Sequence, residues 1–208
     1  MNRNFGAFAP SLDDMRGSFY DTFGALYGGL APAQSGGGTT VPDTVFVGCS
    51  PTYSMPTDHI GTAEYVTSQV IIPSNWDTTS HFRCMVWFAQ ADAETTGEKY
   101  VWNLQNCYAN NGDTLGTYAN TAGTLTLGAS GTTQYAIRCC EFTVPRSNGF
   151  GTAEPGGLLN FKLHRRILGT TGEALLMGVQ FGYWGTVYGG TSSGSLSSKV
   201  LASLRVAH

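Results

Sequence analysis

The residues of this sequence that could do chemistry include a nucleophile-like motif near the C-terminus. Residues 190–194 read Gly-Thr-Ser-Ser-Gly and match G-x-S-x-G, a pattern in which a strained turn exposes a catalytic serine. Such a serine needs an acid and then a histidine later in the chain. No Asp or Glu follows Glu173, and only His208 follows Ser192. We therefore interpret the motif as part of a Ser/Gly linker.

Histidines and carboxylates are too dispersed to predict a metal site or an acid–base pair. The histidines include no H-x-H or H-x-x-x-H pair. Asp113 follows an Asn-Asn-Gly turn and lacks the spaced oxygen ligands of a calcium loop. A glycosidase needs two facing carboxylates, and Glu141 is the one suggestive position, although an outward-facing strand residue is the simpler interpretation. We expect no metal, no cofactor and no enzymatic activity.

Aromatic residues leave a sugar-binding alternative open. The four tryptophans could line a sugar-binding face, but Trp in a β-sandwich more often fills the core or a subunit interface. They are Trp76, Trp87, Trp102 and Trp184.

Composition excludes some classes of partner. Charged residues make up 12% of the 208 residues, against a usual globular share of roughly 25%, which suits a surface covered by neighbours. The net charge is -3 without a basic stripe, so nucleic acid is not an expected partner. No apolar run approaches the length of a membrane span, and no apolar signal segment follows Met1. The five cysteines show no C-x-x-C spacing, so we expect free thiols in a reducing compartment.

Two periodicities indicate the elements that would position these residues. From about residue 44, apolar residues alternate with polar ones in eight short segments separated by Gly, Pro and Asn turns. The fold expected is all-β, an antiparallel jelly-roll-like β-sandwich of about eight strands. The expected strands cover about 44–48, 64–72, 81–88, 99–108, 124–127, 134–144, 158–168 and 174–184.

The first thirty residues follow a different period. Apolar residues fall at spacings of three and four, which predicts an amphipathic helix within residues 5–30. Gly17 and Gly24 each cost such a helix about 1 kcal/mol. It would therefore form against a partner or, alternatively, against its own domain. The stripe comprises Leu12, Met15, Phe19, Phe23, Leu26 and Leu30.

The expected organisation is an N-terminal arm (1–40) with a Gly-rich linker from residue 31, a sandwich domain (41–185) and a C-terminal arm (186–208). The C-terminal arm has apolar residues at helix-like spacing after a Gly/Ser run, although a terminal strand is also possible. The arms would bind a partner. The candidate residues are Phe5, Phe8, Leu12, Met15, Phe19, Phe23 and Leu26 in the first arm, and Leu196, Val200, Leu201 and Leu204 in the second.

Residues 44–185 resemble β-sandwich modules of tailed-bacteriophage virion proteins, such as capsid decoration (cement) proteins and fibre heads. The resemblance is carried by a Pro-x-x-Trp-Asp corner at 73–77 and by the segments 82–88, 100–104, 158–166 and 174–183. It implies a trimeric, non-enzymatic virion protein assembled in the bacterial host cytoplasm.

The length of the linker favours one virion role. A ten-residue linker spans about 18 Å, and the sequence contains no fibrous shaft, so the N-terminal arm would grip something adjacent. We expect a decoration protein that binds the major capsid protein or another virion protein. A tail-fibre or head-fibre protein that binds a receptor or glycan is the alternative.

Overall fold

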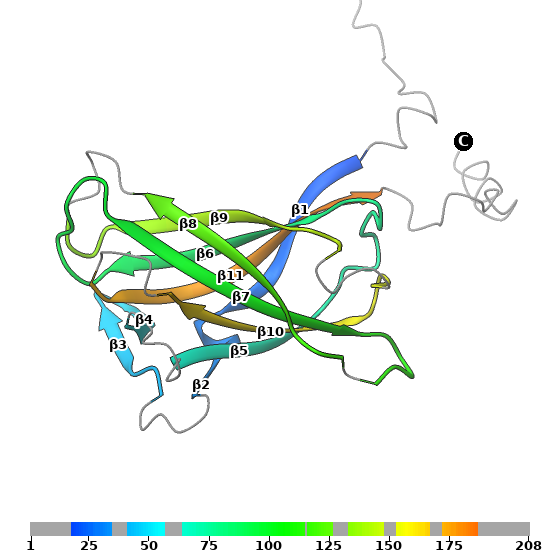
Figure 1. Cartoon of the computed structure of the whole chain (residues 1–208), viewed down its shortest axis with the longest axis horizontal. Helices are drawn as coiled ribbons and strands as arrows, with labels where there is room; N and C mark the ends of the chain where they lie inside the picture. The colour runs from blue at the N-terminus through cyan, green and yellow to red at the C-terminus, as the bar shows by residue number, and fades with distance from the viewer. Residues whose placement is uncertain are drawn as a thin grey trace, which may run out of the picture.

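The chain folds as two antiparallel β-sheets packed face to face (Figure 1). The structure, a computed structural model, describes residues 18–34, 41–56, 64–114, 116–126, 133–147, 153–166 and 172–186. Within these ranges lie eleven strands and one short 3-10 helix, η2 (Tyr27–Gly29). The strands are β1 (Ser18–Leu26), β2 (Ala31–Gln34), β3 (Thr44–Val47), β4 (Ser50–Met55), β5 (Glu64–Ile71), β6 (Phe82–Gln90), β7 (Lys99–Ala109), β8 (Ala119–Thr126), β9 (Ile137–Val144), β10 (Leu158–Arg165) and β11 (Ala174–Thr186).

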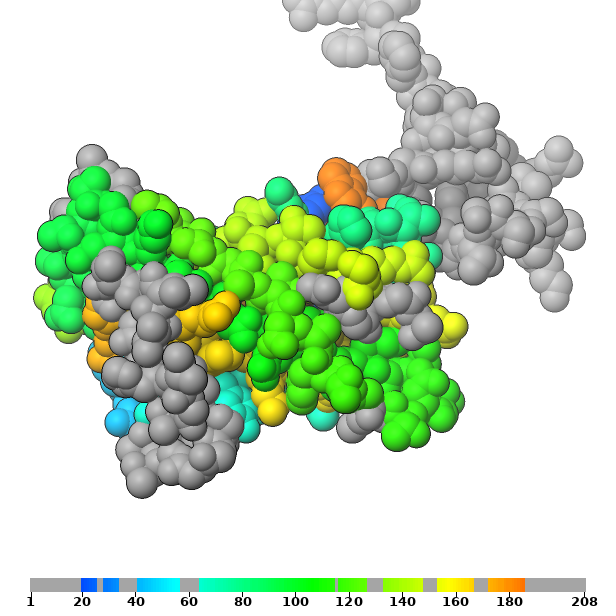
Figure 2. Space-filling view, in the orientation of Figure 1, coloured from blue at the N-terminus to red at the C-terminus, as the bar shows by residue number. Residues whose placement is uncertain are grey.

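The all-β antiparallel sandwich expected from the sequence is confirmed. All eight expected strands overlap observed ones, and β1, β2 and β4 were not expected. The larger sheet has the order β3-β4-β11-β6-β9, with β1 also paired to β11. The five-stranded sheet has the order β2-β5-β10-β7-β8. Green residues of β7 and β8 dominate the face shown in Figure 2, which is therefore the side of the five-stranded sheet.

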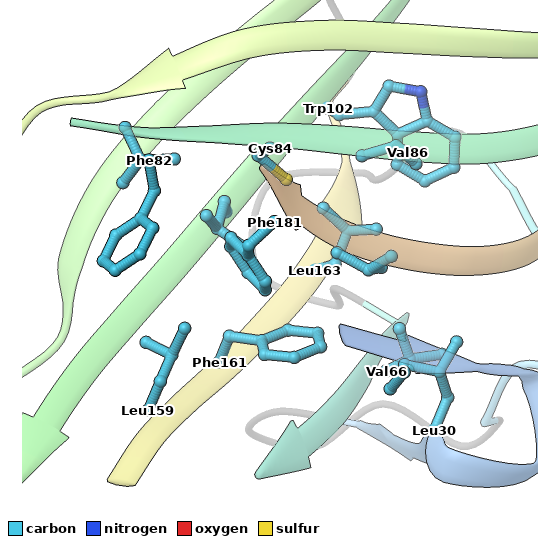
Figure 3. Packing of buried hydrophobic residues seen from close by; sticks show 14 of the residues in the cluster. Leu30, Val66, Phe82, Cys84, Val86, Trp102, Leu159, Phe161, Leu163 and Phe181 are labelled. Carbon is cyan, nitrogen blue, oxygen red and sulfur yellow. The ribbon is translucent and has the colours of Figure 1, made fainter. Parts of the chain in front are cut away.

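Alternating side chains from both sheets form the core (Figure 3). Phe82, Cys84, Val86 and Phe88 point inward from β6, and Leu159, Phe161 and Leu163 point inward from β10, as the period-two pattern predicts. The rings of Phe161 and Phe181 meet between the sheets, with centroids 5.3 Å apart. This packing fixes which residues of each strand must face outward.

A β-bulge in β11 changes one predicted face. Strict period-two alternation along this strand predicts that Leu175, Met177 and Val179 point to the same side. In the structure, Leu176 pairs with Phe88 and Gly178 with Trp87, so Met177 is an extra residue that shifts the alternation. Leu175 therefore pairs with Ala89 on the outward side, whereas Val179 points into the core.

The predicted N-terminal helix is wrong wherever the structure describes that segment. Residues 18–26 form β1, which pairs with β11, and residues 31–34 form β2, which pairs with β5. A Cβ at Gly24 would overlap the carbonyl of Val179, so the glycine that weakens a helix allows β1 to approach β11 closely. The sandwich therefore includes residues 18–34 and begins earlier than the expected boundary at residue 41. Residues 1–17 and 187–208 lie outside the described residues.

Phe23 shows what selected a strand over a helix. Its ring lies 5.5 Å from Phe82, 5.5 Å from Phe181 and 5.8 Å from Tyr183, between centroids. These aromatic contacts, together with hydrogen bonding to β11, outweigh the weak local preference for helix. Over the described ranges, no helix is long and apolar enough to cross a bilayer.

Candidate functional site

The outward side of the five-stranded sheet is rich in amide side chains. These residues alternate with the inward core residues of the same strands, so the packing of the core holds them on the surface. No outward position of β5, β10, β7 or β8 carries a carboxylate. The polar set comprises Thr67, Gln69, Asn103, Gln105, Asn120, Asn160, Lys162 and His164.

This side of the sheet is hollowed. Asn160 is only 6% exposed and Asn103 only 8%, although both are outward-facing strand residues. A groove of about 530 Å³ lies over β5 and β10, and its lining includes Thr67, Gln69, Asn160 and Tyr118 together with the segment 28–31. Tyr118, from the connection between β7 and β8, contributes an exposed aromatic ring to the lining. We call this hollow the amide groove.

A lysine lies between two tyrosine rings beside the amide groove. The Lys162 Nζ is 4.9 Å from the ring centroid of Tyr65 and 4.6 Å from that of Tyr118. Both distances fit cation–π contacts, which hold the ammonium and Tyr118 near each other. Burial raises the pKa of the Tyr118 hydroxyl, with smaller effects from Cys107 and Tyr65, so Tyr118 keeps its proton at neutral pH.

The buried amides Asn103 and Asn160, on this side of the sheet, differ in how their hydrogen bonds are satisfied. Asn103 Nδ2 lies 2.6 Å from His164 Nε2, which accepts in its Nδ1-protonated tautomer, and 3.5 Å from Asn120 Oδ1. Asn160 Nδ2 meets no hydrogen-bond acceptor among the described residues. A buried donor left unpaired costs about 1–3 kcal/mol. Asn160 therefore lines the groove with an amide whose buried donor has no acceptor among the described residues.

The six-stranded sheet carries a second group of exposed side chains, the aromatic strip of Tyr20, Trp87 and Trp184. The rings of Tyr20 and Trp184 meet edge to face at 5.6 Å. Tyr20 lies across Gly182, where a Cβ would overlap its ring. The Trp87 indole donates to Gln180 Oε1 at 2.9 Å. Trp184 is 46% exposed and Trp87 37%, whereas Trp76 and Trp102 are buried in the core, so two of the four tryptophans fill the core and two lie on the surface.

The remaining candidate residues fall in structural positions. Glu141 pairs with Arg83 at 2.6 Å on the outward side of β9, and Asp113 accepts the backbone N–H of Asn110 in a turn, as expected. Among the described residues, no three His, Cys, Asp or Glu side chains are grouped to hold a metal. The cysteines are free thiols, and burial raises the pKa of Cys140 to about 12. The Gly-Thr-Ser-Ser-Gly motif lies outside the described residues.

Three of the predicted partner-binding residues lie in a strand of the sandwich. Phe23 packs into the sandwich, and Phe19 and Leu26 lie in β1. The others, Phe5, Phe8, Leu12, Met15, Leu196, Val200, Leu201 and Leu204, lie outside the described residues, and their role stays a prediction. Sequence reasoning missed the amide groove, although the alternation of Asn160, Lys162 and His164 with core residues was visible in β10.

Comparisons with known proteins give distant structural likenesses. No family model matches the chain, and no curated protein matches its sequence. A xylan-binding module of the CBM15 type is similar over 80% of this chain and 97% of its own, with 11% identity and a TM-score of 0.42. The K2 cleaved adhesin domain of Lys-gingipain is similar over 77% and 99%, with 10% identity and a TM-score of 0.40.

A bacteriophage CBA120 tailspike domain is similar over 80% of this chain and 19% of its own, with 11% identity and a TM-score of 0.27. Identities and TM-scores this low assign no family and carry no functional argument. They also give no support to the capsid-decoration role expected from the sequence. The function has to be argued from the site itself.

Proposed function

We propose that the chain is a non-catalytic binding module that takes a glycan into the amide groove. The observation that carries the proposal is the buried, unpaired donor of Asn160 on the floor of a groove that Tyr118 helps to line. The proposal corresponds to the alternative function expected from the sequence, a protein that binds a receptor or glycan.

The chemistry of a saccharide matches this lining. Sugar hydroxyls both donate and accept hydrogen bonds, and the amides of Asn and Gln offer both functions. The apolar C–H face of a sugar ring packs against an aromatic ring, which Tyr118 supplies. A volume of about 530 Å³ is within the usual range for small-ligand pockets.

Binding without turnover is supported by the types of residue on this face. Glycoside hydrolysis uses two carboxyl groups on either side of the scissile bond. The outward positions of β5, β10, β7 and β8 offer amides, hydroxyls, His164 and lysines instead.

The order β4-β11-β6-β9 against β5-β10-β7-β8 supports the jelly-roll winding expected for the scaffold.

The test is a glycan array with the full chain, followed by titration calorimetry on the best glycan. We expect Y118A and N160L each to weaken binding at least about tenfold, or 1.4 kcal/mol. N160L should leave the free energy of unfolding unchanged or raised, because it removes an unpaired donor at similar volume. W87A, on the other sheet, is the matched control. A blank array, or a loss with W87A alone, would contradict the proposal.

The aromatic strip favours a second candidate function, attachment to another protein. Trp, Tyr, Met and Arg are enriched at protein interfaces, and Met85 and Arg83 lie on the same face as the strip. Two members of the strip, Tyr20 and Trp184, lie where β1 begins and β11 ends, because Ser18 pairs with Thr186. As this second candidate we propose a homotrimeric decoration protein that attaches to a virion coat lattice through the strip.

Double substitution Y20A/W184A tests this second candidate. Occupancy on purified particles should fall, while circular dichroism stays that of the parent chain. Unchanged occupancy would show that Tyr20 and Trp184 are not part of the attachment surface. Y118A, on the opposite sheet, serves as the control.

A further inference from the structure

Lys162 is the cation placed closest to the unpaired donor of the amide groove. Lys162 and Asn160 are two residues apart on β10, so they point to the same side and lie about 7 Å apart along the strand. Thr67 of β5, which lines the groove, pairs with Lys162, and Gln69 pairs with Asn160. The ammonium therefore lies beside the groove, against Tyr118, which lines it together with Asn160.

The surroundings of Lys162 hold its charge without neutralising it. The rings of Tyr65 and Tyr118 lie 4.9 Å and 4.6 Å from the Nζ, and a ring face attracts a cation but carries no net negative charge. The outward positions of the four surrounding strands contain no carboxylate. The ammonium thus keeps its hydrogen-bonding capacity and its net charge beside the groove.

We infer that the amide groove prefers a saccharide with an anionic substituent, whose oxygens accept hydrogen bonds from the Lys162 ammonium and the Asn160 amide. This inference rests on the proposed function and specifies the ligand class. A uronate carboxylate and a sulfate ester share this chemistry, since both present negatively charged oxygens at a fixed place on the ring. Two donors, one of them charged, match such a group better than a neutral hydroxyl.

The two tyrosine rings restrict the position of the Lys162 ammonium before a ligand binds. A free lysine loses much side-chain entropy when it is ordered by a ligand. Contacts with the two rings restrict the ammonium before the ligand arrives, so less of that entropy is lost on binding. Tyr118 therefore acts both on the sugar ring and on the position of the charge.

The test is titration calorimetry of the full chain with three probes: an oligogalacturonide, its methyl ester and a sulfated galactan oligosaccharide. We expect at least one anionic probe to bind about tenfold or more tightly than the methyl ester, with an advantage that shrinks as salt rises. K162M should abolish that advantage, so that the anionic probes and the methyl ester bind with similar affinity, since Met keeps the apolar stem between the rings but carries no charge. K99Q, at the exposed start of β7, is the control and should keep the advantage.

The outcomes separate this inference from the proposed function. Equal affinity for the anionic probes and the methyl ester, with both weakened by N160L, would overturn the anion preference and leave glycan binding standing. No binding to any of the probes or to a glycan array would overturn both. The comparison among probes uses the unmodified chain, so it decides the question even where K162M fails to fold. Tighter binding of one anionic probe than of the other shows whether the groove prefers a uronate carboxylate or a sulfate ester.

Discussion

Arg165 is a guanidinium with no exposed surface, at the end of β10. Its Nη1 donates to the carbonyl of Met55 at 3.1 Å and to that of Gly172. Its Cζ lies 4.8 Å from the ring centroid of Tyr100. Burial lowers the pKa of Arg165 to about 10, with Tyr100 and Glu94 opposing the shift, so the group stays charged at neutral pH. One side chain thereby connects β4, β7 and the segment before β11.

Replacing Arg165 should destabilise the fold strongly. We expect R165A to lower the free energy of unfolding by about 3–5 kcal/mol, because it leaves buried carbonyls without their donor. R165K should restore little, since an ammonium cannot reproduce the planar fork. R166A, at an exposed neighbour, should stay within about 0.5 kcal/mol. Urea unfolding measures all three, and equal values for R165A and R166A would refute the assignment.

Glu173 should make stability depend on pH. Burial raises the pKa of its carboxyl, and Asp92 adds to the shift, while Arg165 opposes it. The folded chain therefore holds a proton that the unfolded chain has released, so this contribution to stability is present at low pH. It is lost as pH rises from about 4.3 through the raised pKa. E173Q should become more stable relative to the parent across that window, as urea unfolding at several pH values would show. If the difference in free energy of unfolding between E173Q and the parent chain does not change with pH, Glu173 is not the source of the pH dependence.

The strands show which elements sequence alone can predict. β6 and β10 alternate apolar residues that point into the core with residues that point outward, so the period-two pattern predicts both strands and their core-facing sides. β1 was misassigned because its aromatic residues also fit a helical stripe, and only its pairing with β11 decides between the two. β2 contains Pro32 and β4 contains Pro51, so both resembled loops. The amides of β10 were visible as outward residues, but the position of Tyr118 outside any strand depends on tertiary structure.

Truncation distinguishes a sandwich that contains β1 and β2 from one that begins near residue 41. A chain lacking residues 1–34 should lose its cooperative thermal transition, because β11 and β5 lose paired neighbours and Phe23 is removed from the core. A chain lacking only residues 1–17 keeps both strands and serves as the reference. Similar melting temperatures for the two truncated chains would show that β1 and β2 are dispensable.

Gly123 of β8 lies where the two sheets meet at one edge. A Cβ at this position would overlap the ring of Phe142, which projects from β9 of the other sheet. We expect G123A to destabilise the chain by about 1–3 kcal/mol through overpacking. G116A meets nothing within 4 Å and should be nearly neutral. Chemical denaturation of both variants compares the two sites directly, and a neutral G123A would mean that the ring moves aside freely.

At the scale of the whole molecule, the amide groove and the aromatic strip lie on opposite sides of one core, because each belongs to the outward side of a different sheet. Ligands of the two surfaces would therefore not compete directly. Under the proposed function, the molecule would hold a glycan with one side while the other side faces a second partner.

Tryptophan quenching can report which side a glycan occupies. None of the four tryptophans lines the amide groove, and the two exposed ones, Trp87 and Trp184, lie on the six-stranded sheet. Acrylamide quenching of the full chain should therefore be unchanged at saturating oligogalacturonide or at saturation with the best array glycan. Protection of the tryptophans would place the ligand on the aromatic strip instead. The W87A/W184A variant keeps only the buried Trp76 and Trp102, and its quenching gives the baseline for these two residues.

The pairing of Ser18 with Thr186 has a mechanical consequence. β1 runs antiparallel to β11 over nine residue pairs, and tension between residues 18 and 186 acts on the first of them. Antiparallel strands pulled apart from adjacent ends separate one hydrogen bond after another, each worth only about 1 kcal/mol, and do not resist together as they would in shear. A pull on both chain ends would thus release β1 at low force while β6 and β10 remain packed.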